Sequence, residues 1–524
     1  MSQLSVVSAA GIDPSTLIHA PSISYAALAP ILIVLAAACL GVLVEALVPR
    51  ALRFNTQLGL TLAALFAALI DVIAVRNTSV VTAASALSID GVSLFIQATI
   101  LVLAALSVLL MAERGVESGS AIVASAAVVV GSPADRKLAG STRVQTEIFP
   151  LLLFAVSGML IFPAANNLLV MFVALEVLSL PLYLMAGLSR RRRLLSQEAA
   201  IKYFLLGAFA SAFFLYGLAL LYGYANSVDL VDILKAQNSS GQSDTLLYLG
   251  FGLLLVGLLF KAGIAPFHSW TPDVYQGSPT AVTAFMASCT KIAAFGAILR
   301  VLYVGFSVSA WDWRPIVWAV AIASMVVGAV VGLTQTDLKR ILAYSSIAHA
   351  GFILVGLVSL DSAGLSSVLF YLASYGFTTV AAFGLLMLVR DGNGGEASHL
   401  SQWSGLAKRS PLFAATFTFL LLALAGIPLT SGFIGKFVVF RAAYHIAGPL
   451  VVIALVTSAI AAFFYLRIVV MMFFAEPAED GPTIAIPSAL SSISITVGTA
   501  ATLVLGVFPQ PLLDLADKAA KLRG

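Results

Sequence analysis

Charged side chains are scarce in this sequence. Only 10% of its 524 residues are Asp, Glu, Lys or Arg, whereas 60% are hydrophobic, and soluble domains carry about 25% charged residues. A water-soluble fold is therefore excluded, and we predict an all-α, polytopic protein of the lipid bilayer. The net charge of +4 is small for this length. Nucleic-acid binding would need a clustered basic face and is not expected.

Cysteines and cofactor motifs are also lacking. Cys39 and Cys289 each lie in an apolar run without a partner at metal or disulfide spacing, so both are interpreted as small core residues and no metal site is expected. No nucleotide, flavin, haem or iron–sulfur motif is present. The string SGFIGKF at 431–437 lacks the glycine spacing and the Ser or Thr of a phosphate-binding loop. No cofactor is therefore expected in this chain.

The start of the chain lacks basic residues. Asp13 is the one charge in the first 23 residues, and no lysine or arginine precedes Arg50. A cleavable signal peptide needs a cationic start, so the first apolar helix is expected to be retained.

Long apolar runs dominate the rest of the sequence. About fourteen segments are long enough to cross a bilayer as helices. They lie at roughly 24–48, 57–75, 90–112, 147–163, 168–188, 196–223, 246–266, 279–306, 315–333, 339–359, 363–390, 412–445 (interrupted), 450–475 and 485–507. Residues 113–146 are broken by charges and are expected to form a cytoplasmic loop.

The basic residues predict the orientation of these segments. The odd-numbered loops contain Arg50, Arg53, Arg114, Arg136, Lys137, Arg143, Arg190 to Arg193, Lys339, Arg340, Arg390, Lys408 and Arg409. The even-numbered loops contain only about five lysines and arginines. By the positive-inside rule the odd loops face the cytoplasm, so both termini face outward. The basic run 190–193 is interpreted as a topology anchor beside anionic lipid.

One stretch, 260–291, combines lysines with a helix break inside apolar sequence. Lys261 is followed by Gly263 and Pro266, and the proline releases the carbonyl of Ala262 from helical hydrogen bonding. Lys291 lies about 18 Å into the next helix, near the bilayer centre.

The sequence A-G-I-A-P of this break recurs as A-G-I-P at 425–428. The two copies fall in the seventh and twelfth segments, which predicts two inverted five-helix repeats with broken helices. Four parts are then expected. They are 1–146 with helices 1 to 3 and the loop, 147–306 as the first repeat, 315–475 as the second, and 485–507 as the last helix.

Five ionisable residues lie within the apolar segments. They are Glu176, Lys202, Lys261, Lys291 and Lys436. Each charge at the bilayer centre costs about 3 kcal/mol, so these residues are expected to face the protein interior. A buried lysine can release its proton whereas an arginine effectively cannot, which favours a role in proton movement. The alternatives are a static carboxylate bridge for Glu176 and a lysine that extends to the interface, most plausible for Lys202.

Two histidines lie near these residues. His268 follows the first break and His349 lies within the tenth segment. A neutral imidazole there could relay protons. The alternative for both is a hydrogen-bonded core histidine.

Four stretches of the sequence resemble the antiporter-like membrane subunits of respiratory complex I, the proton-pumping NADH:quinone oxidoreductase. They are NNLLVMFVALEVLSLPLYLMAGL, KAGIAPFHSWTPDVYQGSPTAVTAFMASCTKIAAF, GLTQTDLKRILAYSSIAHAGF and LAGIPLTSGFIGKF. The similarity runs from about 147 to 475 and is greatest to the subunit N branch. Subunit M has a glutamate in helix twelve, and subunit L continues into a long lateral helix. The loop 113–146 is longer than the family pattern.

The resemblance implies a fourteen-helix bundle with two inverted repeats and assigns roles to the ionisable residues. Glu176 and Lys261 correspond to the modulating pair of one half-channel, Lys291 to the central relay and Lys436 to the exit-side proton carrier. Lys202 matches a further lysine of subunit N.

The resemblance also implies a location and partners. These are a bacterial inner membrane, and membrane-arm and peripheral-arm subunits that hold NADH, FMN, iron–sulfur clusters and quinone. Two rival functions stay open: a subunit of a multisubunit cation/proton antiporter, and a passive assembly scaffold with static charges.

Overall fold

The computed structural model describes residues 23–116, 121–123, 129, 131–133, 144–191, 193–239, 244–392, 394–477 and 481–523. Most of the predicted loop 113–146 lies outside these residues. The membrane-crossing helices are α1 (Tyr25–Leu47), α2 (Arg50–Ala74), α3 (Gly91–Met111), α5 (Ile148–Ile161) with η2 (Phe162–Ala164), α6 (Leu168–Ala186), α7 (Arg193–Ala225), α9 (Asp244–Ala262), α11 (Thr280–Phe285) with η3 (Met286–Thr290), α12 (Lys291–Arg300) with η4 (Val301–Gly305), α13 (Ala310–Thr334), α14 (Leu338–Leu357), α15 (Ser362–Leu386), α17 (Pro411–Ala425), α18 (Ser431–Phe474) and α19 (Ala489–Val507).

Shorter elements lie between or after these helices and were not predicted from the sequence. They are α8 (Leu230–Asn238), α10 (Trp270–Gly277), η5 (Leu400–Trp403), α16 (Leu406–Arg409) and α20 (Gln510–Ala519). Two small antiparallel sheets join β1 (Val80–Thr82) to β2 (Leu87–Ile89) and β3 (Val389–Arg390) to β4 (Thr483–Ile484).

The long helix α18 contains two membrane passages rather than one. Its backbone leaves helical geometry at Ala447, and Pro449 follows. In a straight helix Lys436 and Ser458 would lie about 33 Å apart, yet the Lys436 ammonium donates a 2.9 Å hydrogen bond to the Ser458 hydroxyl. The chain therefore reverses direction at Ala447. Helix α17 and the first limb of α18 together correspond to the predicted interrupted segment 412–445, and the second limb of α18 is a separate passage. Counted in this way and with the shorter helix α5, the described residues cross the bilayer fourteen times, as predicted.

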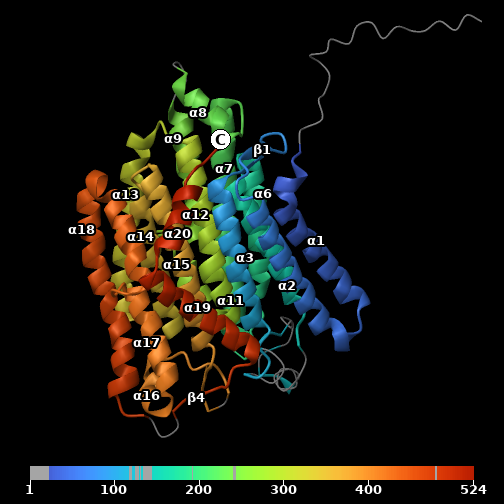
Figure 1. The fold of residues 1–524 in the computed structure, drawn as a ribbon, viewed down its shortest axis with the longest axis vertical. Coiled ribbons are helices and arrows are strands. Elements are labelled where there is room, and N and C mark those ends of the chain that lie inside the picture. Colours follow the sequence, from blue (N-terminus) through green and yellow to red (C-terminus); the bar gives the residue numbers. More distant parts are fainter. Residues whose placement is uncertain are drawn as a thin grey trace, which may run out of the picture.

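The two ends of the described chain lie at the same end of the bundle. The backbone N–H of Ser24 donates to the hydroxyl of Thr82, and the Arg523 guanidinium donates to the carbonyl of Ser79. Both contacts are with the β1 region, which Figure 1 places at the top of the bundle, next to the C-terminus. An even number of passages requires this arrangement.

One membrane-crossing helix, formed by α11, η3, α12 and η4, is completely enclosed by the others. Every residue of its most apolar window is buried. Two turns of this helix, η3 and η4, are π-helical and flank α12. Such turns are found frequently at functional sites. Lys291 begins α12 and is therefore carried by the core of the molecule.

Both predicted helix breaks are present and share one geometry. Helix α9 ends before Gly263 (φ +68°) and α17 ends before Gly426 (φ +86°). After each glycine, an isoleucine N–H bonds to the carbonyl five residues back: Ile264 to Leu259, and Ile427 to Leu422. This Schellman cap needs a left-handed residue, which glycine adopts without strain. The repeated motif therefore codes for the same helix end twice.

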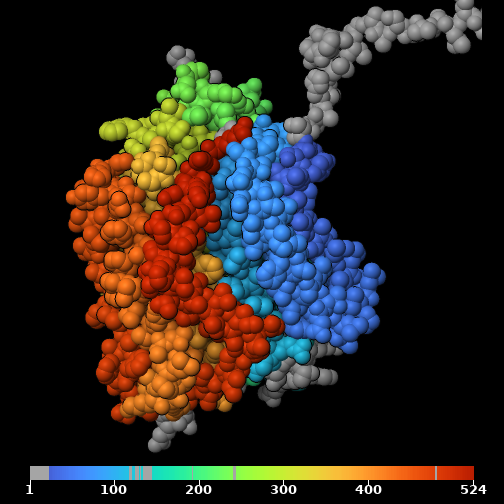
Figure 2. Space-filling model, viewed as in Figure 1, coloured from blue at the N-terminus to red at the C-terminus, as the bar shows by residue number. Residues whose placement is uncertain are grey.

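The last two helices form a band across one face of the bundle. In Figure 2 residues of α19 and α20, in red, run between the blue N-terminal helices and the orange helices. Both helices pack against α3 and α15. The C-terminal helices thus join the first three helices to the second half of the chain.

Candidate functional site: buried lysines along the bundle centre

The first lysine of the site, Lys261, lies at the end of α9. Its ammonium donates to the hydroxyls of Ser179 (2.9 Å) and Tyr203 (3.1 Å), and its side chain is 3% exposed. The rings of Tyr183 and Tyr203 face the ammonium at 5.8 and 5.2 Å. Lys261 is therefore held by neutral groups in a site shielded from solvent.

Glu176 lies one turn before Ser179 on α6, on the same side of that helix. A carboxylate at this position would favour the charged form of a neighbouring lysine. No direct ion pair joins Glu176 to Lys261, although both belong to the described residues, and the Oε1 atom of Glu176 is buried without a hydrogen-bond partner. The predicted pair therefore consists of neighbours that are not in contact in this conformation.

The second lysine, Lys291, binds two backbone carbonyls. Its ammonium donates to Ala262 (3.0 Å) at the end of α9 and to Ser346 (2.9 Å) on α14. Ala262 provides the carbonyl that Pro266 was expected to release. Lys291 is 3% exposed, so its side chain does not extend to the membrane surface.

His349 lies one turn beyond Ser346 on α14. Its Nδ1 lies 2.7 Å from the Tyr371 hydroxyl and its Nε2 lies 3.3 Å from the Tyr465 hydroxyl. The Tyr465 hydroxyl also forms a short hydrogen bond with Ser345. His349 thus belongs to a buried hydroxyl network beside the acceptor of Lys291.

The third lysine, Lys436, binds the second helix break. Its ammonium donates to the carbonyls of Leu424 (3.2 Å) and Ala425 (2.7 Å) and to Ser458. It also lies 4.9 Å from the ring of Phe352, which contacts His349 edge-on. Lys436 lines a cavity of about 330 Å³ within the α18 hairpin, and this cavity opens at the protein surface.

Lys202 was expected to face the protein interior with the other ionisable residues, but the structure places it at the surface, apart from the three buried lysines. Its side chain is 40% exposed and forms ion pairs with Glu198 and Asp273, each at 2.6 Å, and Arg340 pairs with the same aspartate. Burial raises the pKa of Asp273, but the hydrogen bonds from Lys202 and Arg340 outweigh it and hold that pKa below its ordinary value. Lys202 is therefore part of a charged surface cluster.

His268 lies between α9 and α10, after the first break. Its ring meets the Tyr344 ring edge-on, with 6.4 Å between centroids. Its Nδ1 is buried without a hydrogen-bond partner among the described residues. The structure places His268 near the break but not in contact with the buried lysines.

Two buried ion pairs were missed by the sequence analysis. Lys339 pairs with Glu396 at 2.8 Å, and Arg300 pairs with Asp90 at 2.8 Å. Burial would raise the pKa of Glu396, but the charges of Lys339 and Arg390 lower it to about 2. An apolar-run search assigned these residues to segment ends or loops, and only the fold shows that they are buried.

The three buried lysines and His349 form a row whose members are linked through neighbouring residues rather than by direct hydrogen bonds among the described residues. Lys261 adjoins Ala262, whose carbonyl binds Lys291. Lys291 also binds α14, which carries His349, and Phe352 of α14 faces Lys436. The fold and this row define an antiporter-like, multi-span membrane protein.

Comparison with known proteins agrees with that class. A model of the family "NADH:quinone oxidoreductase/Mrp antiporter, TM" matches residues 165–464. NADH-quinone oxidoreductase subunit N of Saccharopolyspora erythraea is 60% identical over 507 residues, 95% of this chain and 98% of that protein. Its counterpart from Parafrankia sp. is 61% identical over 504 residues, 95% of each. The chain therefore belongs to the NADH:quinone oxidoreductase/Mrp antiporter family, in its subunit N branch.

Solved structures show the same fold. A chain of respiratory complex I from Thermus thermophilus with bound aureothin has a TM-score of 0.75 and 34% identity, and the match covers 93% of this chain and 99% of that one. A chain of the Mrp complex from Dietzia sp. has a TM-score of 0.79 at 23% identity, with 95% and 97% covered. At that identity the second similarity concerns the fold alone.

Proposed function

We propose that this chain is a proton-translocating subunit of the membrane arm of a bacterial NADH:quinone oxidoreductase. Its partners are then the other complex I subunits, which hold NADH, FMN, iron–sulfur clusters and quinone. The positive-inside rule supports an inner-membrane orientation with both termini outside. The relatives named subunit N, similar over nearly the whole chain, favour this assignment over a cation/proton antiporter subunit.

One observation carries the proposal: three buried lysines bind neutral acceptors rather than carboxylates. Buried ammonium groups without a counterion are costly, and a lysine can avoid that cost by releasing its proton. Static bridges of a scaffold would instead pair each lysine with an acid, as Lys339 is paired with Glu396. The three lysines are therefore suited to gaining and losing a proton in turn.

The role of Glu176 follows from the lack of a direct ion pair between it and Lys261 among the described residues. A carboxylate beside an ammonium favours the charged form of the lysine, and separation removes that support. Moving a proton against about 150–200 mV requires about 3.5–4.6 kcal/mol. This equals a change of about 2.5–3.5 pKa units. Alternation of Lys261 between Glu176 and its present partners, Ser179 and Tyr203, supplies a change of that kind.

Protons then pass along the row in the order of its contacts. Lys261 transfers its proton to Lys291, and His349 relays the proton to Lys436. Lys436 then releases it through the cavity of the α18 hairpin. Lys202 and His268 are assigned to the margin of this path, beside the charged surface cluster and the first break.

The test is Lys291→Met in the assembled complex, which removes the central ammonium but retains an apolar side chain of similar length. We expect normal complex yield and a loss of proton pumping of at least about tenfold, the effect of about 1.4 kcal/mol. Lys235→Met is the control, because Lys235 is exposed on α8 and, among the described residues, pairs with Asp232 alone. Near-normal proton uptake by vesicles with Lys291→Met would reject the proposal.

A further inference from the structure

Arg300 ends the same α12 segment that Lys291 begins. The two residues are nine positions apart, which is about 13.5 Å along a regular helix and half a turn around it. Their side chains therefore leave the helix on opposite sides. A contact that fixes Arg300 therefore also fixes the position of Lys291 along the helix axis and its direction around that axis.

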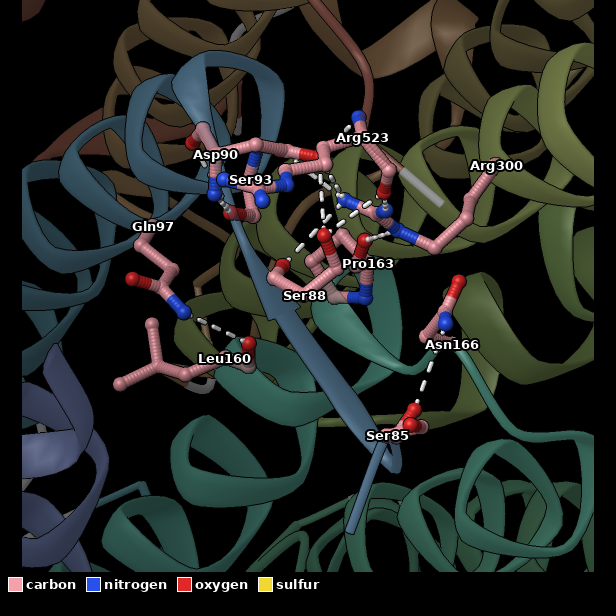
Figure 3. Close-up of polar contacts among 10 residues, drawn as sticks. All are labelled: Ser85, Ser88, Asp90, Ser93, Gln97, Leu160, Pro163, Asn166, Arg300 and Arg523. Atoms are coloured by element: carbon pink, nitrogen blue, oxygen red, sulfur yellow. Dashed lines mark hydrogen bonds and ion pairs between the residues drawn. The ribbon is translucent and has the colours of Figure 1, made fainter. Parts of the chain in front are cut away.

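The Arg300 guanidinium is fully buried and binds three separate segments (Figure 3). It donates to both carboxylate oxygens of Asp90 (2.9 and 2.8 Å), to the carbonyl of Pro163 (2.6 Å) and to the carbonyl of Arg523 (3.0 Å). These groups belong to the start of α3, to η2 and to the end of the chain. A guanidinium with so many acceptors has little freedom to move.

Asp90 is itself rigidly held. It caps α3 by accepting the N–H of Ser93 at 3.0 Å, and the Ser93 hydroxyl accepts the N–H of Asp90 in return. The backbone N–H of Arg523 donates to the same carboxylate at 3.0 Å, and the carbonyl of Arg523 accepts from Ser88. The backbone of Arg523, which follows α20, thereby covers the ion pair between Asp90 and Arg300, as Figure 3 shows.

A second, independent observation places α12 against the same elements. Gly296 lies between Lys291 and Arg300, and a Cβ atom there would come within 2.6 Å of Pro163 and 2.7 Å of Ile96. The helix therefore touches η2 and α3 at its middle as well as at its end. Two π-helical turns, η3 and η4, flank α12, and such turns occur frequently at functional sites.

We infer that Asp90 is a positioning residue for Lys291, acting through Arg300 and locked by the backbone of Arg523. The inference rests on the proposed function. The two acceptors of Lys291 are backbone carbonyls on different helices, so they cannot follow a lysine that moves. If the ion pair is lost, α12 can shift at η4, and the ammonium loses contact with Ala262 or Ser346.

The test uses Asp90→Asn, which keeps the shape and one oxygen but removes the charge. In the assembled complex we expect proton pumping per NADH to fall at least about threefold. The alkaline limb of its pH profile should move to lower pH by about one unit, because a hydrogen bond to a charged group contributes about that much. Asp90→Glu should restore part of the wild-type profile. Lys408→Gln, which breaks the exposed Lys408–Glu476 pair, is the control and should leave the profile unchanged.

A double variant separates positioning from a merely structural role. Adding Asp90→Asn to Lys291→Met should cause no further loss of pumping in the assembled complex, because the positioned group is already absent. A lower yield of complex with an unshifted pH profile for Asp90→Asn would overturn the inference, as would additive losses in the double variant. Normal pumping by Lys291→Met alone would instead reject the proposed function.

Discussion

Substitution of Gly426 by alanine should displace the side chain of Lys436, because Gly426 lies directly beside it. Gly426 has φ +86° and ψ 42° at the end of α17, a left-handed conformation that costs a residue with a Cβ about 1–2 kcal/mol. An added Cβ would also lie 2.9 Å from Cδ and 3.0 Å from Nζ of Lys436. Because ordinary contacts begin at 3.4 Å, the lysine must retreat by about half an ångström.

This retreat affects the hydrogen bonds that hold the ammonium. The shorter of its two carbonyl contacts, 2.7 Å to Ala425, and the longer, 3.2 Å to Leu424, both lie beside Gly426. Loss of one hydrogen bond to a charged group costs about 1.5–3 kcal/mol. We therefore expect Gly426→Ala to lower proton pumping by about tenfold or more, with the complex still assembled.

The assay is NADH-driven proton uptake by membrane vesicles, normalised to the amount of complex. Gly394→Ala is the matched control for backbone strain, because Gly394 also has a positive φ (+74°) and an added Cβ would meet nothing closer than 3.4 Å. It should pump normally. Equal pumping by Gly426→Ala and the wild type, or an equal loss in Gly394→Ala, would refute the reasoning about Lys436.

Two further predictions concern carboxylates. Glu176→Gln should lower turnover about tenfold, the effect of one pKa unit in a neighbour, whereas Glu176→Asp should lower it less, because charge matters more than reach. Steady-state NADH oxidation coupled to pumping measures both, and an equally inactive Asp variant would favour geometry over charge. Glu396 has its pKa lowered from 4.5 to about 2, so its stabilising charge is complete above about pH 4.5 and is lost as the pH falls towards 2. The unfolding temperature of Glu396→Gln should therefore change less with pH across this range than that of the wild type. An unchanged pH dependence would show that the Glu396 charge does not stabilise the fold.

The membrane-crossing helices were predictable because lipid imposes long apolar runs. The predicted segment 24–48 is α1 (Tyr25–Leu47), and the predicted segment 279–306 spans Thr280 to Gly305. The break at Gly426 was also predictable, because glycine followed by proline ends a helix locally. Helix α20 was missed, since its ten residues are too few and too polar for a search based on apolar length.

The candidate site was predictable in its residues but not in its contacts. Charges inside apolar runs identified Lys261, Lys291 and Lys436, and all three are buried. The same reasoning also identified Lys202, whose side chain is 40% exposed. Their partners are hydroxyls and carbonyls from distant helices, and such groups carry no signal in the sequence. Arg300 was overlooked because it stands near a segment end, and its partner Asp90 is 210 residues away.

Lys436→Arg tests most directly whether the buried lysines work by releasing protons. An arginine keeps the charge but effectively never deprotonates, and the cavity of about 330 Å³ beside Lys436 leaves room for a guanidinium. The measurement is the number of protons pumped per NADH oxidised, made with purified complex in sealed liposomes. If the lysines release protons, the Lys436→Arg complex should assemble but lose its pumping, whereas wild-type stoichiometry with arginine at this position would contradict proton release by Lys436.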